Sequence, residues 1–214
     1  MRFDIITIFP EIFNSFLKES LLAKAQEKKI IKINVYNLRD FVEGKHQVVD
    51  DKPYGGGPGM VLKIEPIHKA LKKIKGGKKT KVVFLSPRGK KFTQRIAEKW
   101  AKDLKQLIIV SGRYEGIDER IRKLADETIS VGDFITLGGE VPTMAVIEAV
   151  ARLIPGVVGR RESIEKLDFP QYTRPEIFSP KKEMKLAVPK VLVSGDHKKI
   201  EEWRKKHSKE IRKN

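Results

Sequence analysis

The chain has 214 residues, 40% of them hydrophobic, and its 45 Lys and Arg against 28 Asp and Glu give a formal net charge of +17. This apolar fraction is enough for one medium domain, alone or with a small appendage, which excludes a wholly disordered basic tail. The sequence contains no cysteine, so we expect neither disulfides nor thiol chemistry. It also contains no apolar run long enough to span a membrane and no signal-peptide pattern, so we expect a cytoplasmic protein without a membrane partner.

Strand-like and helical segments alternate from the N-terminus onward. The apolar, β-branched run 3–9 predicts a buried strand, and a stripe of apolar residues over 11–28 predicts a helix. A second strand is expected at 32–36. A loop rich in Asp and Gly follows at 40–60, and a helix over 67–74 ends at two glycines.

The same alternation continues through the middle of the chain. An amphipathic pattern predicts a helix over 93–104, and Thr143 is a candidate cap for a further helix that a Pro-Gly pair stops. Short strands alternating with helices predict an α/β domain with a mostly parallel sheet over residues 1–158. The remaining strands are expected at 82–85, 107–110 and 128–131.

The chain changes character after this domain. Residues 159–172 combine mixed charge with Pro170, which predicts an interdomain linker. Residues 173–214 are polar and basic, and they contain a helical pattern from Lys198 to His207. We therefore expect a small helical domain at the C-terminus.

The positive charge is unevenly distributed. Residues 68–105 hold 14 Lys or Arg against 2 acids, and residues 181–214 hold 12 against 5, whereas the glycine-rich middle, 106–159, holds 5 against 8. Such segregation favours an anionic partner, most often nucleic acid, over a uniformly solvated surface. For 68–105 two interpretations stay open: a second RNA-binding face, or a solvated basic surface.

Loops that follow the predicted strands are the first candidates for a ligand site. Parallel α/β sheets bind ligands at the carboxyl ends of their strands. Three such loops occur, at 85–89, 111–118 and 130–140, and each contains glycine, which lets the backbone approach a ligand closely. Backbone N–H and C=O groups of these loops could then bind the edge of an adenine.

Several common motifs are absent. No G-x-G-x-x-G follows a strand and no G-x-x-x-x-G-K-[ST] occurs, which argues against dinucleotide and P-loop sites. The four histidines are scattered and the serines lack a G-x-S-x-G elbow, so we expect neither a metal centre nor a hydrolase triad. The glycine run 55–59 is by itself typical of a mobile surface loop, and its neighbours Asp50, Asp51, Pro53 and Tyr54 favour a lid over an active site. The segment 50–60 is called the lid below.

Four sequence blocks together resemble one family. They are DDKPYGGGPGM at 50–60, GRYEGIDER at 112–120, SVGDF at 130–134 and YTRP at 172–175. These blocks are similar to those of the TrmD family, the bacterial tRNA (guanine-N1)-methyltransferases of the SPOUT class. The resemblance covers nearly the whole chain in order, and each of the first two blocks is specific alone.

The resemblance implies an α/β domain tied in a trefoil knot, an exception to the rule against knotted chains. It implies a homodimer with shared active sites and a helical C-terminal domain that binds tRNA near the anticodon. It also implies that the activity depends on Mg²⁺, although no protein-ligated metal site is expected. It also implies that S-adenosylmethionine binds in the knot loops. By position, its expected partners are Leu85, Ser86, Pro87, Gly112, Tyr114, Glu115, Gly116, Val131, Gly132, Asp133, Phe134, Ile135, Thr136, Leu137, Gly138, Gly139 and Pro142.

The implied product is 1-methylguanosine immediately 3′ of the anticodon. Guanine N1 carries a proton, so a carboxylate base must remove it as N1 attacks the sulfonium methyl group, and an arginine can stabilise negative charge on O6. The resemblance assigns the arginine to Arg152. The base stays open, because the linker is shorter than in the family and lacks its Asp-Ser-Phe segment: Asp168 is the first choice, and Glu162 and Glu165 are alternatives.

Substrate contacts are expected from the lid, the YTRP block and the basic C-terminal region. A rival hypothesis is a catalytically impaired RNA-binding protein on the same scaffold, which the missing Asp-Ser-Phe segment favours and the intact cofactor loops oppose. A SPOUT enzyme for another RNA position is a weaker rival. The expected substrate-binding residues are Asp50, Tyr54, Gly55 and Arg174, with phosphate contacts from Lys181, Lys182, Lys198, Lys199, Arg204, Lys205, Lys206 and Arg212.

Overall fold

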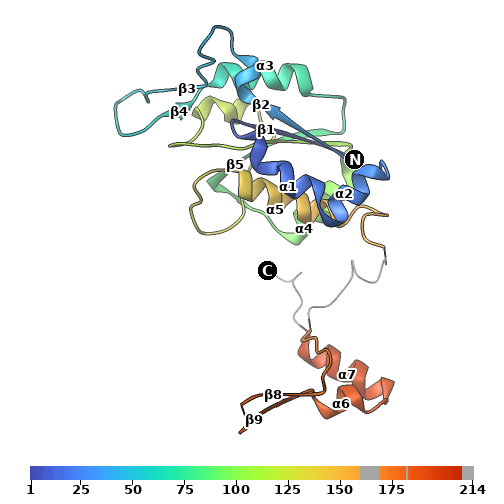
Figure 1. Ribbon diagram of the computed structural model, residues 1–214. Helices are drawn as coiled ribbons and strands as arrows, with labels where there is room; N and C mark the ends of the chain where they lie inside the picture. Colours follow the sequence, from blue (N-terminus) through green and yellow to red (C-terminus); the bar gives the residue numbers. More distant parts are fainter. Residues whose placement is uncertain (160–168, 182, 209–214) are drawn as a thin grey trace. The chain divides into compact units, whose positions relative to one another are not determined.

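The computed structural model of the chain describes residues 1–159, 169–181 and 183–208 (Figure 1). The chain divides into two compact units, Met1–Ile164 and Glu165–Asn214. Most of the predicted linker at 159–172 lies outside the described residues, so the linker stays a prediction.

The first unit is built on a sheet of five parallel strands in the order β2-β1-β6-β5-β7. Every strand predicted for this domain is present, which confirms the mostly parallel α/β architecture. Strand β5 is longer than predicted, but its residues 86–89 leave the ladder, because Leu85 and Lys90 both pair with Ile129. The strands are β1 (Arg2–Thr7), β2 (Lys32–Asn37), β5 (Thr80–Lys91), β6 (Gln106–Val110) and β7 (Glu127–Ser130).

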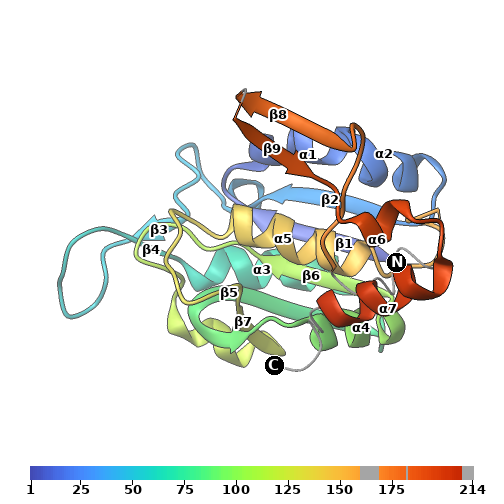
Figure 2. The same ribbon diagram turned by 90° about the horizontal axis from the view of Figure 1, so that it is seen from below.

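Helices cover both faces of this sheet (Figures 1 and 2). One face carries a core that includes Phe3, Trp100 and Val146. It is covered by α1 (Asn14–Lys18), α2 (Ser20–Glu27), α4 (Gln94–Asp103) and α5 (Glu140–Ala151). The other face is covered by α3 (Ile64–Ile74) and by the 3-10 turns η2 (Leu38–Phe41) and η3 (Glu119–Lys123).

Two helix predictions are wrong in detail. The helix expected over 11–28 is broken into η1 (Pro10–Phe13), α1 and α2, because Glu19 is extended and Ser20 has a φ of 57°. Thr143 does not cap α5, which begins three residues earlier at Glu140. The buried Thr143 hydroxyl instead shares a 2.7 Å hydrogen bond with that of Ser111.

The second unit contains a hairpin and two helices. Strands β8 (Ile177–Lys181) and β9 (Met184–Ala187) pair antiparallel, and α6 (Lys190–Val193) and α7 (His197–His207) follow. Helix α7 matches the helical pattern of the sequence, and the Asp196 side chain caps it by accepting from the Lys199 N–H. The hairpin was not predicted, because all of its described residues are exposed and no buried face marks it.

Candidate functional site

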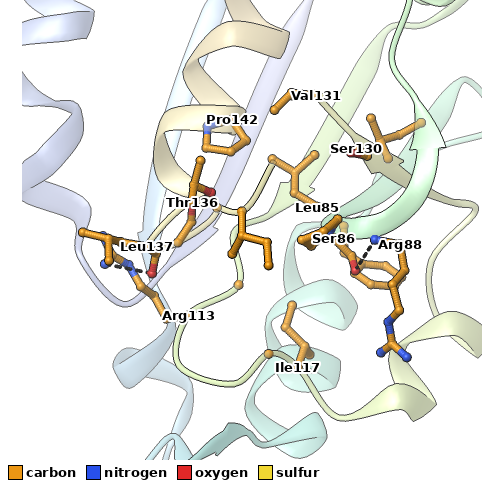
Figure 3. Close-up of a pocket in the computed structure, with 18 of the residues that line it drawn as sticks. Leu85, Ser86, Arg88, Arg113, Ile117, Ser130, Val131, Thr136, Leu137 and Pro142 are labelled. Carbon is orange, nitrogen blue, oxygen red and sulfur yellow. Dashed lines mark hydrogen bonds between the residues drawn. The ribbon is translucent and has the colours of Figure 1, made fainter. Parts of the chain in front are cut away.

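A pocket of about 460 Å³ opens where the first half of β5 runs into its irregular stretch 86–89 and meets the loops after β6 and β7 (Figure 3). Parallel strands bring their carboxyl ends to one edge, so three loops far apart in sequence line a single cavity. The volume is within the range of pockets that bind small molecules and cofactors.

The residues that the resemblance assigns to S-adenosylmethionine gather at this pocket. All of them line it except Gly132 and Asp133. Asp133 is exposed and forms an ion pair with Lys91, with 2.7 Å between Oδ2 and Nζ. The other lining residues were not assigned to the ligand: Arg88, Arg113, Ile117, Glu119 and Ser130 lie in the candidate loops and blocks, whereas Phe84 and Ile129 lie outside them.

The loop after β6 turns tightly along the pocket. Tyr114 has a φ of 59° and Gly116 a φ of 128°, backbone conformations that reverse the chain within a few residues. The end of the lid packs against this turn. The Glu115 N–H donates to the Met60 carbonyl at 3.0 Å, and the Leu62 N–H donates to the Gly116 carbonyl at 2.9 Å. The lid is therefore anchored beside the pocket.

The lid is bracketed by the short strands β3 (Asp50–Asp51) and β4 (Val61–Leu62), and its tip extends away from the sheet (Figure 2). Tyr54 is fully exposed and Gly55 has a φ of 86°. At the base of the lid, a Cβ on Gly59 would lie 2.6 Å from Cγ of Glu115, a contact too short for a side chain. Glycine there lets the lid lie directly against the Glu115 side chain.

The loop after β7 crosses directly over the loop after β6. The Gly139 N–H donates to the Gly112 carbonyl at 2.7 Å. A Cβ on Gly139 would lie 2.7 Å from the Gly112 nitrogen and 2.8 Å from Cα of Ser111, and both of these are backbone atoms. Only glycine allows this crossing.

A buried network centred on Glu140 holds these loops together. The carboxylate is 1% exposed and accepts from Arg113 Nε and from the Thr7 hydroxyl, each at 2.8 Å. The Arg113 guanidinium also reaches the Leu137 carbonyl at 3.4 Å (Figure 3) and lies 4.8 Å from the centre of the Phe9 ring. Sequence reasoning missed this network, because its partners stand on three different strands and loops.

The acidic side chains at the pocket differ in their pairing. Glu119 forms ion pairs with Arg88 and Arg122, whereas Glu115 forms none with the described residues. A carboxylate without a partner in the chain suits a cationic group on a ligand. Just beyond the pocket, the hydrogen bond from the Arg120 guanidinium holds the pKa of the Asp118 carboxyl below its usual value.

Apolar side chains surround the mouth of the pocket. Phe134 is 59%, Ile135 86% and Leu137 93% exposed, although all three line the cavity. Covering such side chains is favourable by about 25 cal/mol for each Å² of apolar surface. A ligand or a second protein chain is therefore expected to contact them.

Arg152 is the one predicted catalytic residue within the described part of the chain, and it does not line the pocket. Arg152 follows the last residue of α5, whereas the first turn of that helix borders the pocket. At 1.5 Å per residue, the twelve residues of α5 separate the two by about 18 Å along the helix axis. Asp168, Glu162 and Glu165 lie outside the described residues.

Expected RNA contacts in the second unit are exposed wherever the structure describes them. Two of the lysines are paired within the unit: Lys199 with Asp196 at 3.0 Å and Lys205 with Glu201 at 2.9 Å. Lys182 and Arg212 lie outside the described residues. The exposed cations are Arg174, Lys181, Lys198, Lys199, Arg204, Lys205 and Lys206.

Two general features were also searched over residues 1–159, 169–181 and 183–208. No cluster of three or more His, Asp or Glu side chains there could hold a metal ion. No helix in the same part of the chain is both long and apolar enough to cross a membrane.

A parallel sheet with a glycine-lined pocket at its carboxyl edge is the arrangement typical of α/β proteins that bind a small ligand. A family model described as tRNA (Guanine-1)-methyltransferase TrmD matches residues 1–214, and the chain belongs to this family. This confirms the resemblance found in the sequence motifs and the predicted enzyme class.

Curated relatives cover almost the whole chain. A tRNA (guanine-N(1)-)-methyltransferase of Carboxydothermus hydrogenoformans is 50% identical over 97% of this chain and 83% of its own length. Proteins with the same description from Clostridium tetani and Dictyoglomus turgidum are 48% and 47% identical, over 99% and 97% of this chain and 89% and 85% of their own lengths.

Proposed function

We propose that this protein transfers a methyl group from S-adenosylmethionine to N1 of the guanosine 3′ of the anticodon in tRNA. The observation that carries the proposal is the pocket at the carboxyl edge, which gathers nearly all of the residues that the family resemblance assigns to the methyl donor. Membership of the family supports guanine in tRNA as the acceptor.

The residues at the pocket suit S-adenosylmethionine. Backbone groups of the turns at 112–116 and 134–139 line the cavity and offer hydrogen bonds to an adenine edge. The Glu115 carboxylate, which forms no ion pair with the described residues, complements the positive charge of the ligand, and the exposed side chains of Ile135 and Leu137 offer it apolar contact. When bound, this group supplies an electrophilic methyl on a sulfonium.

The chain itself must supply a base and a cation. In our proposal Asp168, with Glu162 and Glu165 as alternatives, accepts the N1 proton as N1 attacks the methyl carbon and the carbon–sulfur bond breaks. Arg152 stabilises the negative charge that develops on O6. Preorganised charge of this kind typically contributes a factor of about 10²–10³ to the rate.

We propose a homodimer in which Arg152 and the linker acid of one copy complete the pocket of the other. The separation of about 18 Å between Arg152 and the pocket in its own chain supports this arrangement. Exposed apolar side chains on α5 and η1, which pack together, offer an interface: Val141 is 65% and Ile12 39% exposed. The crossing of the loop after β7 over the Ser111–Gly112 backbone supports the trefoil knot.

We assign the remaining parts as follows. Residues 1–158 form the knotted domain that binds S-adenosylmethionine, 159–172 the linker and 173–214 the tRNA-binding domain, with a hairpin in addition to its helices. Mg²⁺ assists without a protein-ligated site. The protein acts in the cytoplasm, on tRNA.

One experiment tests the reaction. The protein is incubated with methyl-labelled S-adenosylmethionine and tRNA transcripts carrying guanosine or adenosine at the target position. We expect label on the first transcript only, and Asp168→Asn should reduce single-turnover transfer while tRNA affinity is kept. Label on both transcripts would refute the site in the tRNA, near-native transfer by Asp168→Asn would refute its role as base, and no label on either would favour the RNA-binding rival.

A further inference from the structure

The amino-terminal edge of the sheet, opposite the pocket, carries a group of lysines that the proposed reaction does not use. All strands of the sheet are parallel, so the turns that lead into β2, β5 and β6 meet at this edge. We call their lysines the lysine edge. Its members, all exposed, are Lys28, Lys29, Lys32, Lys75, Lys78, Lys79, Lys102 and Lys105.

Backbone hydrogen bonds place these segments side by side. The Lys105 N–H donates to the Lys79 carbonyl at 2.9 Å, and the Arg2 N–H donates to the Lys105 carbonyl at 2.9 Å. The Lys32 N–H donates to the Met1 carbonyl at 3.0 Å. The N-terminal ammonium group lies at the same edge, bonded to the Ile30 carbonyl at 3.1 Å (Figure 1). Charges from four separate segments therefore share one surface.

A buried polar network fixes the spacing of these segments. The Gln106 side chain accepts from the Gly76 N–H and the Thr80 hydroxyl, each at 2.8 Å, and donates to Asp4 at 2.6 Å. Asp4 in turn accepts from Arg2 at 2.8 Å and from Asn34 at 2.7 Å. These hydrogen bonds connect the turn before β5 to β1, β2 and β6, so the positions of the lysine-bearing segments relative to one another are fixed.

The lysine edge differs from the pocket region in its ion pairing. None of the eight lysines forms an ion pair with a described residue, and the exposed acids in the same turns are Glu27 and Asp103. Around the pocket, by contrast, Arg88, Lys91 and Arg113 are each paired with a carboxylate. Unpaired like charges held close together repel one another, so an anionic partner would stabilise this surface.

We propose that the lysine edge is a second RNA-binding surface, which contacts phosphates of the tRNA remote from the methylated base; this rests on the proposed function. Strands of five to six residues make the sheet roughly 17–20 Å deep, so the edge cannot reach a base held in the pocket. From β2 to β5 are three strand spacings, about 14 Å, which is enough to meet several phosphates of one strand.

The test compares two full-length variants that each lose four positive charges. The edge variant is Lys75→Gln, Lys78→Gln, Lys79→Gln and Lys105→Gln. The control variant removes exposed cations elsewhere on the same unit: Lys18→Gln, Lys24→Gln, Arg95→Gln and Lys99→Gln. The affinity for a tRNA transcript is measured over a range of KCl concentrations, together with single-turnover methyl transfer at saturating tRNA.

We expect the edge variant to bind tRNA at least about tenfold more weakly, and the slope of log affinity against log salt to fall by about two to three. Transfer at saturating tRNA should be unchanged, and the control should stay within about twofold of the parent protein. If the edge variant does not fold, Lys28→Gln, Lys29→Gln and Lys32→Gln together are compared with a control that also loses three charges, Lys18→Gln, Lys24→Gln and Lys99→Gln.

Equal affinity and equal salt slope for the edge and control variants would overturn the proposal. So would unchanged tRNA binding with lost binding to phosphatidylserine vesicles, since the surface would then serve a membrane. The failure of this proposal and the failure of the proposed function can be distinguished. If the edge variant binds tRNA more weakly but the parent protein transfers no methyl group, the proposed function fails and the RNA-binding surface stands.

Discussion

Replacement of Gly139 by Ala tests the claim that backbone crossing shapes the pocket. The new Cβ would lie 2.7 Å from the Gly112 nitrogen, whereas ordinary contact begins at 3.4 Å, so the two loops must separate by about 0.7 Å. Gly139 has a φ of −80°, which alanine adopts without strain, so the effect is purely steric. The 2.7 Å hydrogen bond between the loops is stretched at the same time.

The expected cost is about 2–4 kcal/mol, the sum of overpacking at about 1–3 and a hydrogen bond at about 1. For a unit of this size, about 2–4 °C of melting temperature accompany each kcal/mol, so a fall of about 4–16 °C is expected. Because both loops line the pocket, the dissociation constant of S-adenosylmethionine should rise at least about tenfold, which corresponds to about 1.4 kcal/mol.

Thermal unfolding and calorimetric titration with S-adenosylmethionine measure the two effects. Gly77→Ala is the matched control, because its Cβ meets nothing within 4 Å and its backbone is not left-handed. The control should leave both quantities unchanged. A Gly139→Ala protein that melts and binds like the parent would refute the steric reasoning.

Three further predictions address other parts of the site. Glu140→Gln weakens the bonds to Arg113 and Thr7 and should destabilise the unit by about 2 kcal/mol, whereas Glu43→Gln, at an exposed pair with Lys69, should leave the stability unchanged; equal melting temperatures would contradict this. Arg152→Ala should lower single-turnover transfer by about 10²–10³ without changing affinity for S-adenosylmethionine, and a loss of that affinity instead would show that Arg152 shapes the pocket. Because the pKa of Asp118 is lowered in the folded state, its contribution to stability is present above about pH 4 and is lost as the pH falls below that. Urea unfolding of Asp118→Asn should therefore show a smaller loss of stability from pH 5 to pH 3 than the parent protein does. Identical pH profiles of the two proteins would refute the role of Arg120.

Local sequence patterns were enough to predict the strands of the sheet, although not their order. Buried parallel strands are nearly continuous apolar runs, so β1, the first half of β5 and β6 were recognisable without any tertiary information. The edge strands β2 and β7 are more polar and less buried, and their β-branched residues marked them instead. The breaks in the pattern were less visible. The stripe over 11–28 continues through the kink at Ser20, because both pieces bury their apolar side chains in the same core.

The sequence by itself also indicated which loops line the pocket, since its glycine-rich blocks follow the strands whose carboxyl ends meet there. Only the tertiary structure showed that Glu140 joins Arg113 and Thr7, and that Arg152 lies at the far end of α5. The lysine edge likewise required the fold, because its members come from separate turns that only parallel pairing brings together. The physical reason is the same in each case: periodicity reports which side of a segment is buried, whereas contacts between distant segments are set by strand order and packing.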